Sequence, residues 1–358
     1  MARQTVPNTH SDPDPIARWL ALVAVLIAGL VVVGGFVRLS RAGLSIVEWD
    51  VFAGVAPPIG DAAWDEAFAA YQQTPEYQIV NDGMSLAAFK EIFLIEWAHR
   101  LIARVAGLFV VVPLAWFMWK RVLTPRESLP YWGVAALFGA QGAVGWFMVA
   151  SGLVDRPMVD HFRLTFHLLM ALLLLAIVLW MVLGRTPLPD PSRGRPMEAR
   201  TRTLAWVTMG ALVVQLSYGG IVAGLRAGHV SNTWPLMAGE LVPSNLLSTY
   251  EPWWRNLVEP LGAHWVHRWF AVVVAALAVT LAIRIRREGV GAPAAALASW
   301  LVGVVSTQVA LGVVVVLLNV PKWFALAHQA VAVVLFALLV VVCHQARHSR
   351  TSLRRAEV

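Results

Sequence analysis

Glu96-Trp97-Ala98-His99-Arg100 and His264-Trp265-Val266-His267-Arg268 each lie at the start of a long apolar segment of the sequence. Downstream of each string, a further apolar segment begins close to another histidine, His167 in the first case and His328 in the second. Histidine is uncommon in such segments because an ionisable side chain is costly to place among apolar groups. The two strings therefore indicate two copies of an arrangement that pairs histidines on different apolar segments.

The composition of the 358-residue chain indicates that it lies in a membrane. Hydrophobic residues make up 58% of the sequence, charged residues make up only 14%, and 17 residues are tryptophan. A single soluble core cannot bury so much apolar surface. Segments of about 20 apolar residues cross a bilayer as helices, because a backbone in lipid must satisfy its own hydrogen bonds. Eight such segments are expected, at residues 16–38, 92–119, 131–152, 162–183, 204–225, 262–283, 295–318 and 324–343.

The distribution of basic residues predicts the orientation of these segments. If the amino terminus is cytoplasmic, most of the 28 lysines and arginines fall on the inner side, as the positive-inside rule requires. Eight crossings return the chain to the side on which it began, so both termini are expected in the cytoplasm. This asymmetry accounts for the net charge of +7, and no nucleic-acid partner is expected.

An internal repeat divides the chain into two similar halves. Residues 34–54 align with residues 219–239 at a constant offset, and nine of the 21 positions are identical. The match continues at shorter offsets, where the four histidines named above align in pairs and Gln141 aligns with Gln308. Because each half has an even number of segments, both halves enter the membrane in the same direction. The expected fold is an all-α membrane protein of two tandem four-helix bundles, related by a pseudo-two-fold axis along the membrane normal.

The repeat also predicts the domain organisation. Residues 1–185 are expected to form the amino-terminal bundle, residues 186–203 a cytoplasmic linker, and residues 204–358 the carboxy-terminal bundle. The outer segment of residues 39–91 is far longer than a simple connection and carries many aromatic and acidic residues. It is expected to cap the first bundle, and a docking surface for a partner is the alternative.

The repeated histidines are candidate metal ligands. Each lies near the outer start of its helix, so all four are expected at a similar depth in the outer half of the membrane. Two imidazoles on different helices of one bundle can face each other across the core, where bundles hold cofactors. A haem iron with two axial imidazoles fits that arrangement. His99 with His167 and His267 with His328 are the expected pairs, although a lone histidine at a helix end is more often an interfacial residue.

Charged residues lie next to these histidines. Arg100 and Arg268 directly follow a candidate ligand and can pair with haem propionates, but anchoring at the membrane interface explains them equally well. Glu96 and His264 occupy equivalent positions one helical turn earlier. A carboxylate at only one of two sites can hold water, move a proton or stabilise a cation, which makes Glu96 the candidate catalytic residue. Its alternative role is to orient His99.

These residues resemble the haem A synthase family of bacterial plasma membranes and mitochondrial inner membranes. The resemblance is carried by the eight segments, the duplicated halves, the string of residues 96–100 and the four histidines. The outer stretch of residues 64–77, with Trp64, Tyr71 and Glu76, is similar to the mitochondrial and proteobacterial branch. Some members carry a cysteine pair in an outer loop. This chain contains only Cys343, which is expected to serve in packing.

The resemblance implies an oxidoreductase. The implied reaction oxidises the C8 methyl group of haem O to a formyl group through successive hydroxylations, and so makes haem A for cytochrome c oxidase. A haem b cofactor is implied in the carboxy-terminal half, at His267, His328 and Arg268. The substrate haem O is implied in the amino-terminal half, at His99, His167 and Arg100, with Glu96 as a functional residue.

The resemblance further implies a location in the bacterial inner membrane, with the haem sites toward the periplasm. Haem O synthase and cytochrome c oxidase assembly factors are the implied partners beside haem O and membrane lipid, and oligomerisation stays open. Two other functions remain as alternatives. One is a b-type di-haem cytochrome that exchanges electrons with a quinone, and the other is a haem transporter or chaperone.

Overall fold

The computed structural model describes residues 14–48, 53–153, 157–186 and 196–356. Half of the expected linker of residues 186–203 lies outside these ranges, at residues 187–195. Eight of the helices are long and apolar enough to cross a membrane, which confirms the all-α membrane class. They are α1 (Pro15–Leu39), α4 (Leu86–Trp119), α5 (Pro125–Ala150), α6 (His161–Arg185), α7 (Ala199–Leu225), α8 (Pro260–Arg287), α9 (Ala292–Leu317) and α10 (Lys322–Ala356). Each expected segment overlaps one helix, and α4 and α5 begin six residues earlier than expected.

Side-chain oxygens begin several of these helices. The carboxylate of Asp14 accepts a hydrogen bond from the backbone N–H of Ile16 at the start of α1, and Asp160 caps α6 in the same way. At the start of α5, Thr124 and Glu127 form a reciprocal capping box, in which each side chain accepts from the other's backbone N–H. The first N–H groups of a helix have no partner within it, so these caps fix where each helix begins.

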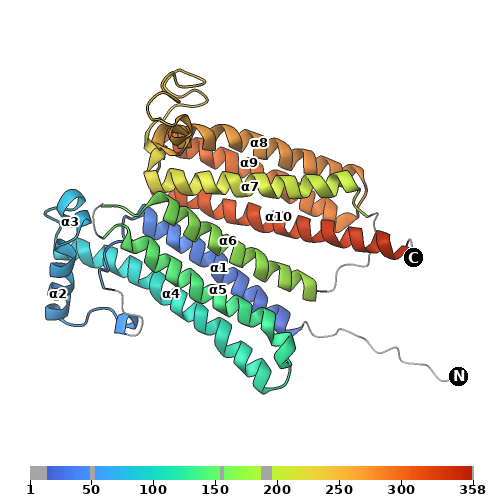
Figure 1. Ribbon diagram of the computed structural model, residues 1–358, viewed down its shortest axis with the longest axis horizontal. Helices are drawn as coiled ribbons and strands as arrows, with labels where there is room; N and C mark the ends of the chain where they lie inside the picture. Colours follow the sequence, from blue (N-terminus) through green and yellow to red (C-terminus); the bar gives the residue numbers. More distant parts are fainter. Residues whose placement is uncertain (1–13, 49–52, 154–156, 187–195, 357–358) are drawn as a thin grey trace.

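The helices form two rings of four. Helices α1, α4, α5 and α6 contact one another in ring order, and α7, α8, α9 and α10 do the same (Figure 1). Helices α1, α6, α7 and α10 also make the contacts between the two halves. This arrangement is consistent with the expected tandem bundles. The start of α1 and the end of α10 lie at the same end of the molecule, opposite the short helices α2 (Asp61–Gln72) and α3 (Pro75–Val80).

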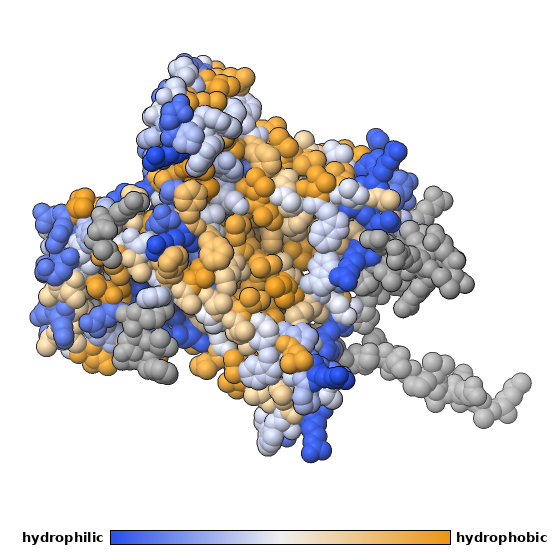
Figure 2. All heavy atoms as spheres, in the orientation of Figure 1, coloured by the Kyte–Doolittle hydropathy of each residue, from blue (hydrophilic) through white to orange (hydrophobic). Residues whose placement is uncertain are grey.

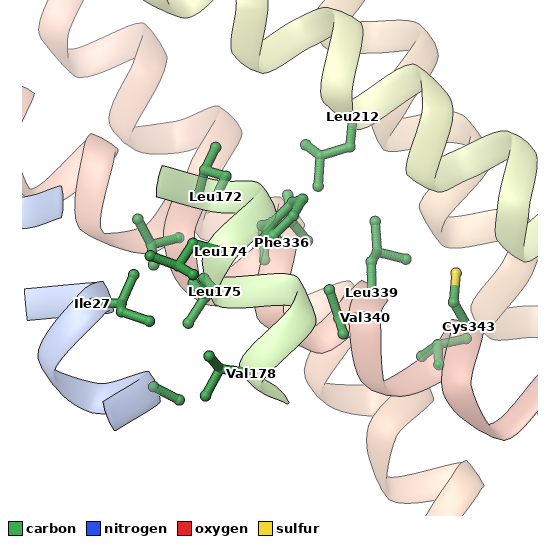
Figure 3. Close-up of a cluster of buried hydrophobic side chains, with 14 of the residues drawn as sticks. Ile27, Leu172, Leu174, Leu175, Val178, Leu212, Phe336, Leu339, Val340 and Cys343 are labelled. Carbon is green, nitrogen blue, oxygen red and sulfur yellow. The ribbon is translucent and has the colours of Figure 1, made fainter. Parts of the chain in front are cut away.

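The largest buried core lies where the two halves meet. Figure 3 shows apolar side chains from four helices pointing toward one another, among them Ile27 of α1, Leu175 of α6, Leu212 of α7 and Leu339 of α10. Cys343 is buried in the same core, so it packs there as expected. Burial of this apolar surface between α1, α6, α7 and α10 joins the two bundles into one body.

A close approach of α1 and α10 adds a polar contact to this core. The side-chain amide of Gln329 donates a hydrogen bond to the backbone carbonyl of Val31 at 2.7 Å. A Cβ atom at Gly35 would overlap the same amide, so a side chain there would displace Gln329 from this contact.

The outer segment of the first half folds over the start of α4. Tyr71 of α2 and Phe89 of α4 are fully buried, with ring centres 5.1 Å apart, and Trp64 and Phe68 pack around them. This aromatic cluster holds α2 and α3 against α4, where the expected cap was placed. In the second half, the corresponding outer segment contains only the 3-10 helices η3 (Ala227–His229) and η4 (Trp253–Val258) among its described residues.

The surface of the molecule has the polarity of a membrane protein. Figure 2 shows apolar side chains over the middle of the helices, with hydrophilic residues gathered at the two ends. Large apolar residues such as Leu108, Val112 and Val272 are exposed there. Exposed apolar surface of this extent requires an apolar environment around the helices.

Candidate functional site

The second ring brings His267 and His328 face to face. His267 lies on α8 and His328 on α10, which stand diagonally across the ring. The two imidazole centres are 6.4 Å apart, and the ring planes meet at 76°. With metal–nitrogen bonds of about 2 Å on each side and each nitrogen about 1 Å from its ring centre, two axial imidazoles on one iron stand about 6 Å apart. The observed separation therefore fits a haem iron held between the two histidines.

Each imidazole of this pair contacts a glutamine on the preceding helix. The amide nitrogen of Gln215 lies 3.1 Å from Nδ1 of His267 and donates to the His267 backbone carbonyl at 2.9 Å. The amide nitrogen of Gln308 lies 3.2 Å from Nε2 of His328, whose Nδ1 lies 3.1 Å from the Gln308 backbone carbonyl. The Nδ1–H of His328 can donate to that carbonyl, which leaves Nε2 as the accepting nitrogen of the ring, and here the Gln308 amide faces it.

The first ring holds the other two repeated histidines. His99 lies on α4 and His167 on α6, again on helices that stand diagonally across the ring. The amide nitrogen of Gln141 lies 3.4 Å from Nε2 of His167 and donates to the His167 backbone carbonyl at 3.0 Å. For His99, Nδ1 is buried and has no hydrogen-bond partner.

All four imidazoles pack against a glycine of the helix that precedes them in their ring. A Cβ atom added at Gly312 would lie 3.0 Å from Cε1 of His328, and the equivalent distances are 3.1 Å at Gly145, 3.3 Å at Gly219 and 3.4 Å at Gly34. At Gly145, Gly219 and Gly312 a Cβ would require the imidazole to move by a few tenths of an ångström, whereas 3.4 Å at Gly34 is ordinary van der Waals contact. A glycine therefore lies beside each of the four imidazoles, and the closeness of the contact differs among them.

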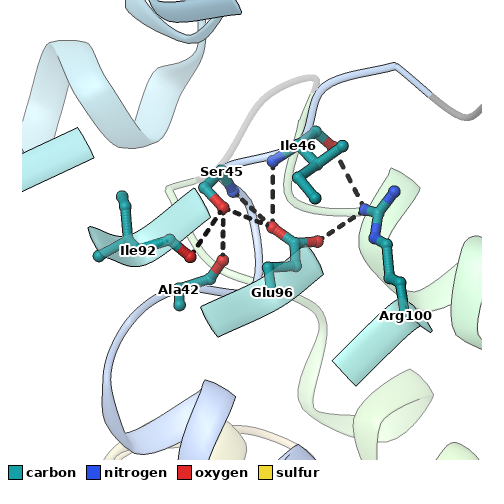
Figure 4. Close-up of polar contacts among 6 residues, drawn as sticks. All are labelled: Ala42, Ser45, Ile46, Ile92, Glu96 and Arg100. Carbon is teal, nitrogen blue, oxygen red and sulfur yellow. Dashed lines mark hydrogen bonds and ion pairs between the residues drawn. The ribbon is translucent and has the colours of Figure 1, made fainter. Parts of the chain in front are cut away.

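Glu96 is held by donors from the chain that leaves α1. It is 2% exposed, and its Oε2 accepts hydrogen bonds from the Ser45 N–H at 2.8 Å, the Ser45 hydroxyl at 2.7 Å and the Ile46 N–H at 3.0 Å. Its Oε1 forms an ion pair with Arg100 at 2.6 Å (Figure 4). Arg100 also donates to the Ile46 carbonyl. Glu96 thus anchors residues 45–46 beside the first histidine pair, a role that its position in the sequence did not reveal.

Arg268 has a different environment from Arg100. It is 4% exposed, donates to the Thr233 carbonyl and lies 5.4 Å from the Trp234 ring centre. Its Nε and Nη1 are buried without a hydrogen-bond partner, and so is Nδ1 of His264. Unpaired guanidinium donors one residue from a candidate ligand fit a haem propionate, because a buried cation requires an anionic partner.

A second buried carboxyl group lies on α3, beside the aromatic cluster that joins α2 and α3 to α4. Glu76 of α3 is 3% exposed, and the Tyr71 hydroxyl donates to it at 3.4 Å while Asn81 donates to the Tyr71 oxygen at 2.7 Å. Burial, together with the charge of Glu96, raises the pKa of Glu76 to about 7, against the opposite effect of the Tyr71 hydrogen bond. Sequence reasoning missed this group, because nothing in the spacing of residues 71–81 indicates that the carboxyl is buried.

The donor set suits a cofactor held by two protein ligands. Among the described residues, no three histidine, cysteine, aspartate or glutamate side chains gather at one place as a metal cluster requires. Two opposed imidazoles leave the remaining coordination positions of an iron for a porphyrin.

Comparisons with known proteins agree with this chemistry. The family model described as "Cytochrome oxidase assembly protein" matches residues 17–340. A protein of Rhodopseudomonas palustris strain BisB5 named "Heme A synthase" is 43% identical over 332 residues, which cover 91% of this chain and 90% of that protein. The chain belongs to the haem A synthase family. Proteins of the same name from Sphingopyxis alaskensis and Brucella ovis are each 42% identical, over 93% of this chain and 92% of their own length.

Membership of the haem A synthase family confirms the resemblance that the residues suggested. The relatives are proteobacterial, and this chain matches them over about nine tenths of their length. The assignment of individual haem A synthase site residues stays a proposal, which the geometry above supports.

Proposed function

We propose that this chain is a haem A synthase, an oxidoreductase that converts the C8 methyl group of haem O to a formyl group by successive hydroxylations. The observation that carries the proposal is the pair of imidazoles on α8 and α10, whose ring centres are 6.4 Å apart, in a chain of this family whose other half has a histidine on each of the equivalent helices, α4 and α6. A bis-imidazole site in each half suits an enzyme that uses one haem and modifies another.

The two halves are proposed to have different roles. The carboxy-terminal bundle, residues 204–358, holds haem b between His267 and His328, with the unpaired donors of Arg268 available to a propionate. The amino-terminal bundle, residues 1–185, receives haem O between His99 and His167. The support for this division is the difference between the two arginines, since Arg100 is already paired with Glu96.

The residues of the first bundle are proposed to prepare the site for this reaction. Haem iron supplies the oxidising chemistry that a porphyrin methyl group requires. Glu96 fixes Arg100 and residues 45–46 at the outer end of the site, so that a propionate meets a cation of set position. The aromatic cap of α2 and α3 covers the start of α4 and limits the access of water. Glu96 is the candidate catalytic residue because it lies one helical turn before His99. Its contacts in the structure hold Ser45, Ile46 and Arg100 in position.

The proposed location is the bacterial inner membrane. The basic residues at the end of α8 and in the loop after α4 support a cytoplasmic position for the beginning of α1 and the end of α10, because positive charge is usually kept on the inner side. The histidine pairs then face the periplasmic half of the membrane. The proposed partners are haem O synthase, which supplies the substrate, and the assembly factors of cytochrome c oxidase, which use the product.

Extraction of the bound haems from the purified full-length chain, with identification by mass, tests the function. Haem b together with haem O or haem A is expected. Haem b alone would indicate the b-type cytochrome, and a substoichiometric mixture with no conversion of haem O would indicate a transporter or chaperone.

Substitution of the ligands tests the sites. His267→Ala and His328→Ala are each expected to remove the low-spin haem b spectrum. The matched control is His229→Ala, because His229 is an exposed histidine at the same end of the molecule and is bonded to Asn319. An unchanged spectrum in both ligand variants would place haem b elsewhere.

A further inference from the structure

Three of the four repeated imidazoles contact a glutamine side chain, and at the fourth the sequence has leucine in the aligned position. Gln141, Gln215 and Gln308 each stand one turn before the glycine that packs against the imidazole. At the offset that aligns the two halves, Gln215 corresponds to Leu30, one turn before Gly34. Leucine has no side-chain donor or acceptor, so His99 lacks the contact that its three counterparts make.

The glutamines are placed to fix the orientation of the rings. Gln141 and Gln215 bridge the backbone carbonyl and a ring nitrogen of the same histidine, which ties the imidazole to its own helix. In all three glutamines the amide oxygen is buried and has no partner. The amide nitrogen, a donor, lies at a ring nitrogen, which is Nδ1 of His267 but Nε2 of His167 and His328. A metal-bound imidazole carries a hydrogen on its second nitrogen, and rotation of the amide would bring the buried oxygen to the ring to accept it.

His99 has the least restrained ring of the four. Its Nδ1 is buried without a hydrogen-bond partner, as is Nδ1 of His167, but the His167 ring has the contact of its Nε2 with Gln141. Its contact with Gly34, at 3.4 Å from an added Cβ, is the longest of the four glycine contacts, which range down to 3.0 Å. The helix around it is nevertheless fixed, because Glu96 and Arg100 bind residues 45–46. The freedom is therefore confined to the imidazole itself.

We propose that Gln141, Gln215 and Gln308 are positioning residues that hold three imidazoles in the ligating orientation, and that Leu30 makes His99 the exchangeable ligand of the first site. This inference rests on the proposed function, in which one haem leaves as product while the other stays. A ligand whose ring can turn away without breaking a hydrogen bond lowers the barrier to release. His167, held by Gln141, remains in place to receive the next substrate.

The dissociation rate of iron protoporphyrin IX from each bundle tests the inference. Full-length chain carrying His267→Ala reports on the first bundle, and chain carrying His99→Ala reports on the second, each with an excess of a haem-scavenging apoprotein. Leu30→Gln is expected to slow release from the first bundle by about tenfold or more, the effect typical of an added ligand-orienting contact. Leu30→Met, which changes the side chain without adding a donor, is the matched control and should release haem at the parent rate.

The converse variants test the glutamines. Gln215→Met and Gln308→Met keep the length of the side chain and remove the amide, and each is expected to speed release from the second bundle by about 10- to 100-fold. Electron paramagnetic resonance of the ferric low-spin haem should show shifted g values, because the imidazole planes can then rotate. A merely structural role would lower the yield of protein without moving these values. Since the two glutamines lie on different helices, one variant remains informative if the other does not fold.

The possible failures are distinguishable. Equal release from Leu30→Gln and Leu30→Met, with parent rates and g values in both glutamine variants, would overturn the inference and leave haem binding intact. Failure of both parent backgrounds to take up iron protoporphyrin IX would instead refute the proposed function, and this inference with it.

Discussion

The anchor formed by Glu96 makes a quantitative prediction. In Glu96→Gln, the three hydrogen bonds from Ser45 and Ile46 pass from a charged to a neutral acceptor, a loss of about 1 kcal/mol each. The ion pair with Arg100 is lost as well, at side chains that are only 3% and 12% exposed. We expect the free energy of unfolding to fall by about 3–5 kcal/mol, the range for breaking a buried pair on one side.

A double-mutant cycle separates the ion pair from the rest. Arg100→Met alone is expected to lower the free energy of unfolding by less than Glu96→Gln does, because in that variant Glu96 keeps its three hydrogen bonds from Ser45 and Ile46. The double variant should lose about 1–3 kcal/mol less free energy of unfolding than the sum of the two single losses. That difference is the coupling energy expected for two groups in direct contact. Unfolding is followed by SDS titration in mixed micelles, with haem b content as the measure of the intact second bundle.

The chain contains a matched control for this cycle. Arg255 and Glu259 also form an ion pair four residues apart, but at 3.6 Å and with side chains that are 54% and 28% exposed. Their coupling is expected to stay below about 1 kcal/mol. If Glu96→Gln costs less than about 1 kcal/mol and shows no coupling to Arg100, Glu96 is not an anchor. Loss of haem A formation at unchanged stability would then assign it to the chemistry.

Three further predictions follow from single contacts. Gly312→Ala should cost about 1–3 kcal/mol by overpacking and lower the haem b content of purified protein, because the new methyl group meets His328 at 3.0 Å. Glu76→Gln should stabilise the fold at alkaline pH. The carboxyl has a pKa of about 7 in the folded chain against 4.5 in the unfolded chain, so ionisation of Glu76 destabilises the folded parent. In unfolding titrations the difference in free energy of unfolding between variant and parent should grow from about pH 4.5 and level off above pH 7 at about 3 kcal/mol. Gly35→Leu should separate α1 from α10 by displacing Gln329, which a lower unfolding midpoint would report, whereas an unchanged midpoint would contradict the close approach.

The membrane helices could be predicted from sequence because their length and apolarity are local properties. The ends of the helices could not be predicted from apolarity. Helix α4 includes Lys90 and Glu91, because a helix can continue beyond the membrane with polar residues. The cap was expected over residues 39–91, but α2 and α3 were not, because their packing depends on how Tyr71 meets Phe89.

Some residues of the candidate site could likewise be predicted from the sequence, and others could not. The four histidines could be found because duplication preserved them at matching positions. The partners of Glu96 could not be found, because two of its donors are backbone N–H groups of Ser45 and Ile46, which any residue supplies. The contact of Gln215 with His267 depends on the relative rotation of α7 and α8, which the repeat does not encode.

The apolar contact of α1, α6, α7 and α10 has a consequence for redox chemistry. Close-packed side chains are poorly compressible, so the two histidine pairs stand at a separation that thermal motion of the outer loops leaves unchanged. Electrons exchanged between redox groups held at these pairs would tunnel through a medium of constant thickness. The rate of that exchange would be a property of the protein interior, and substitutions in the loops would leave it unaltered.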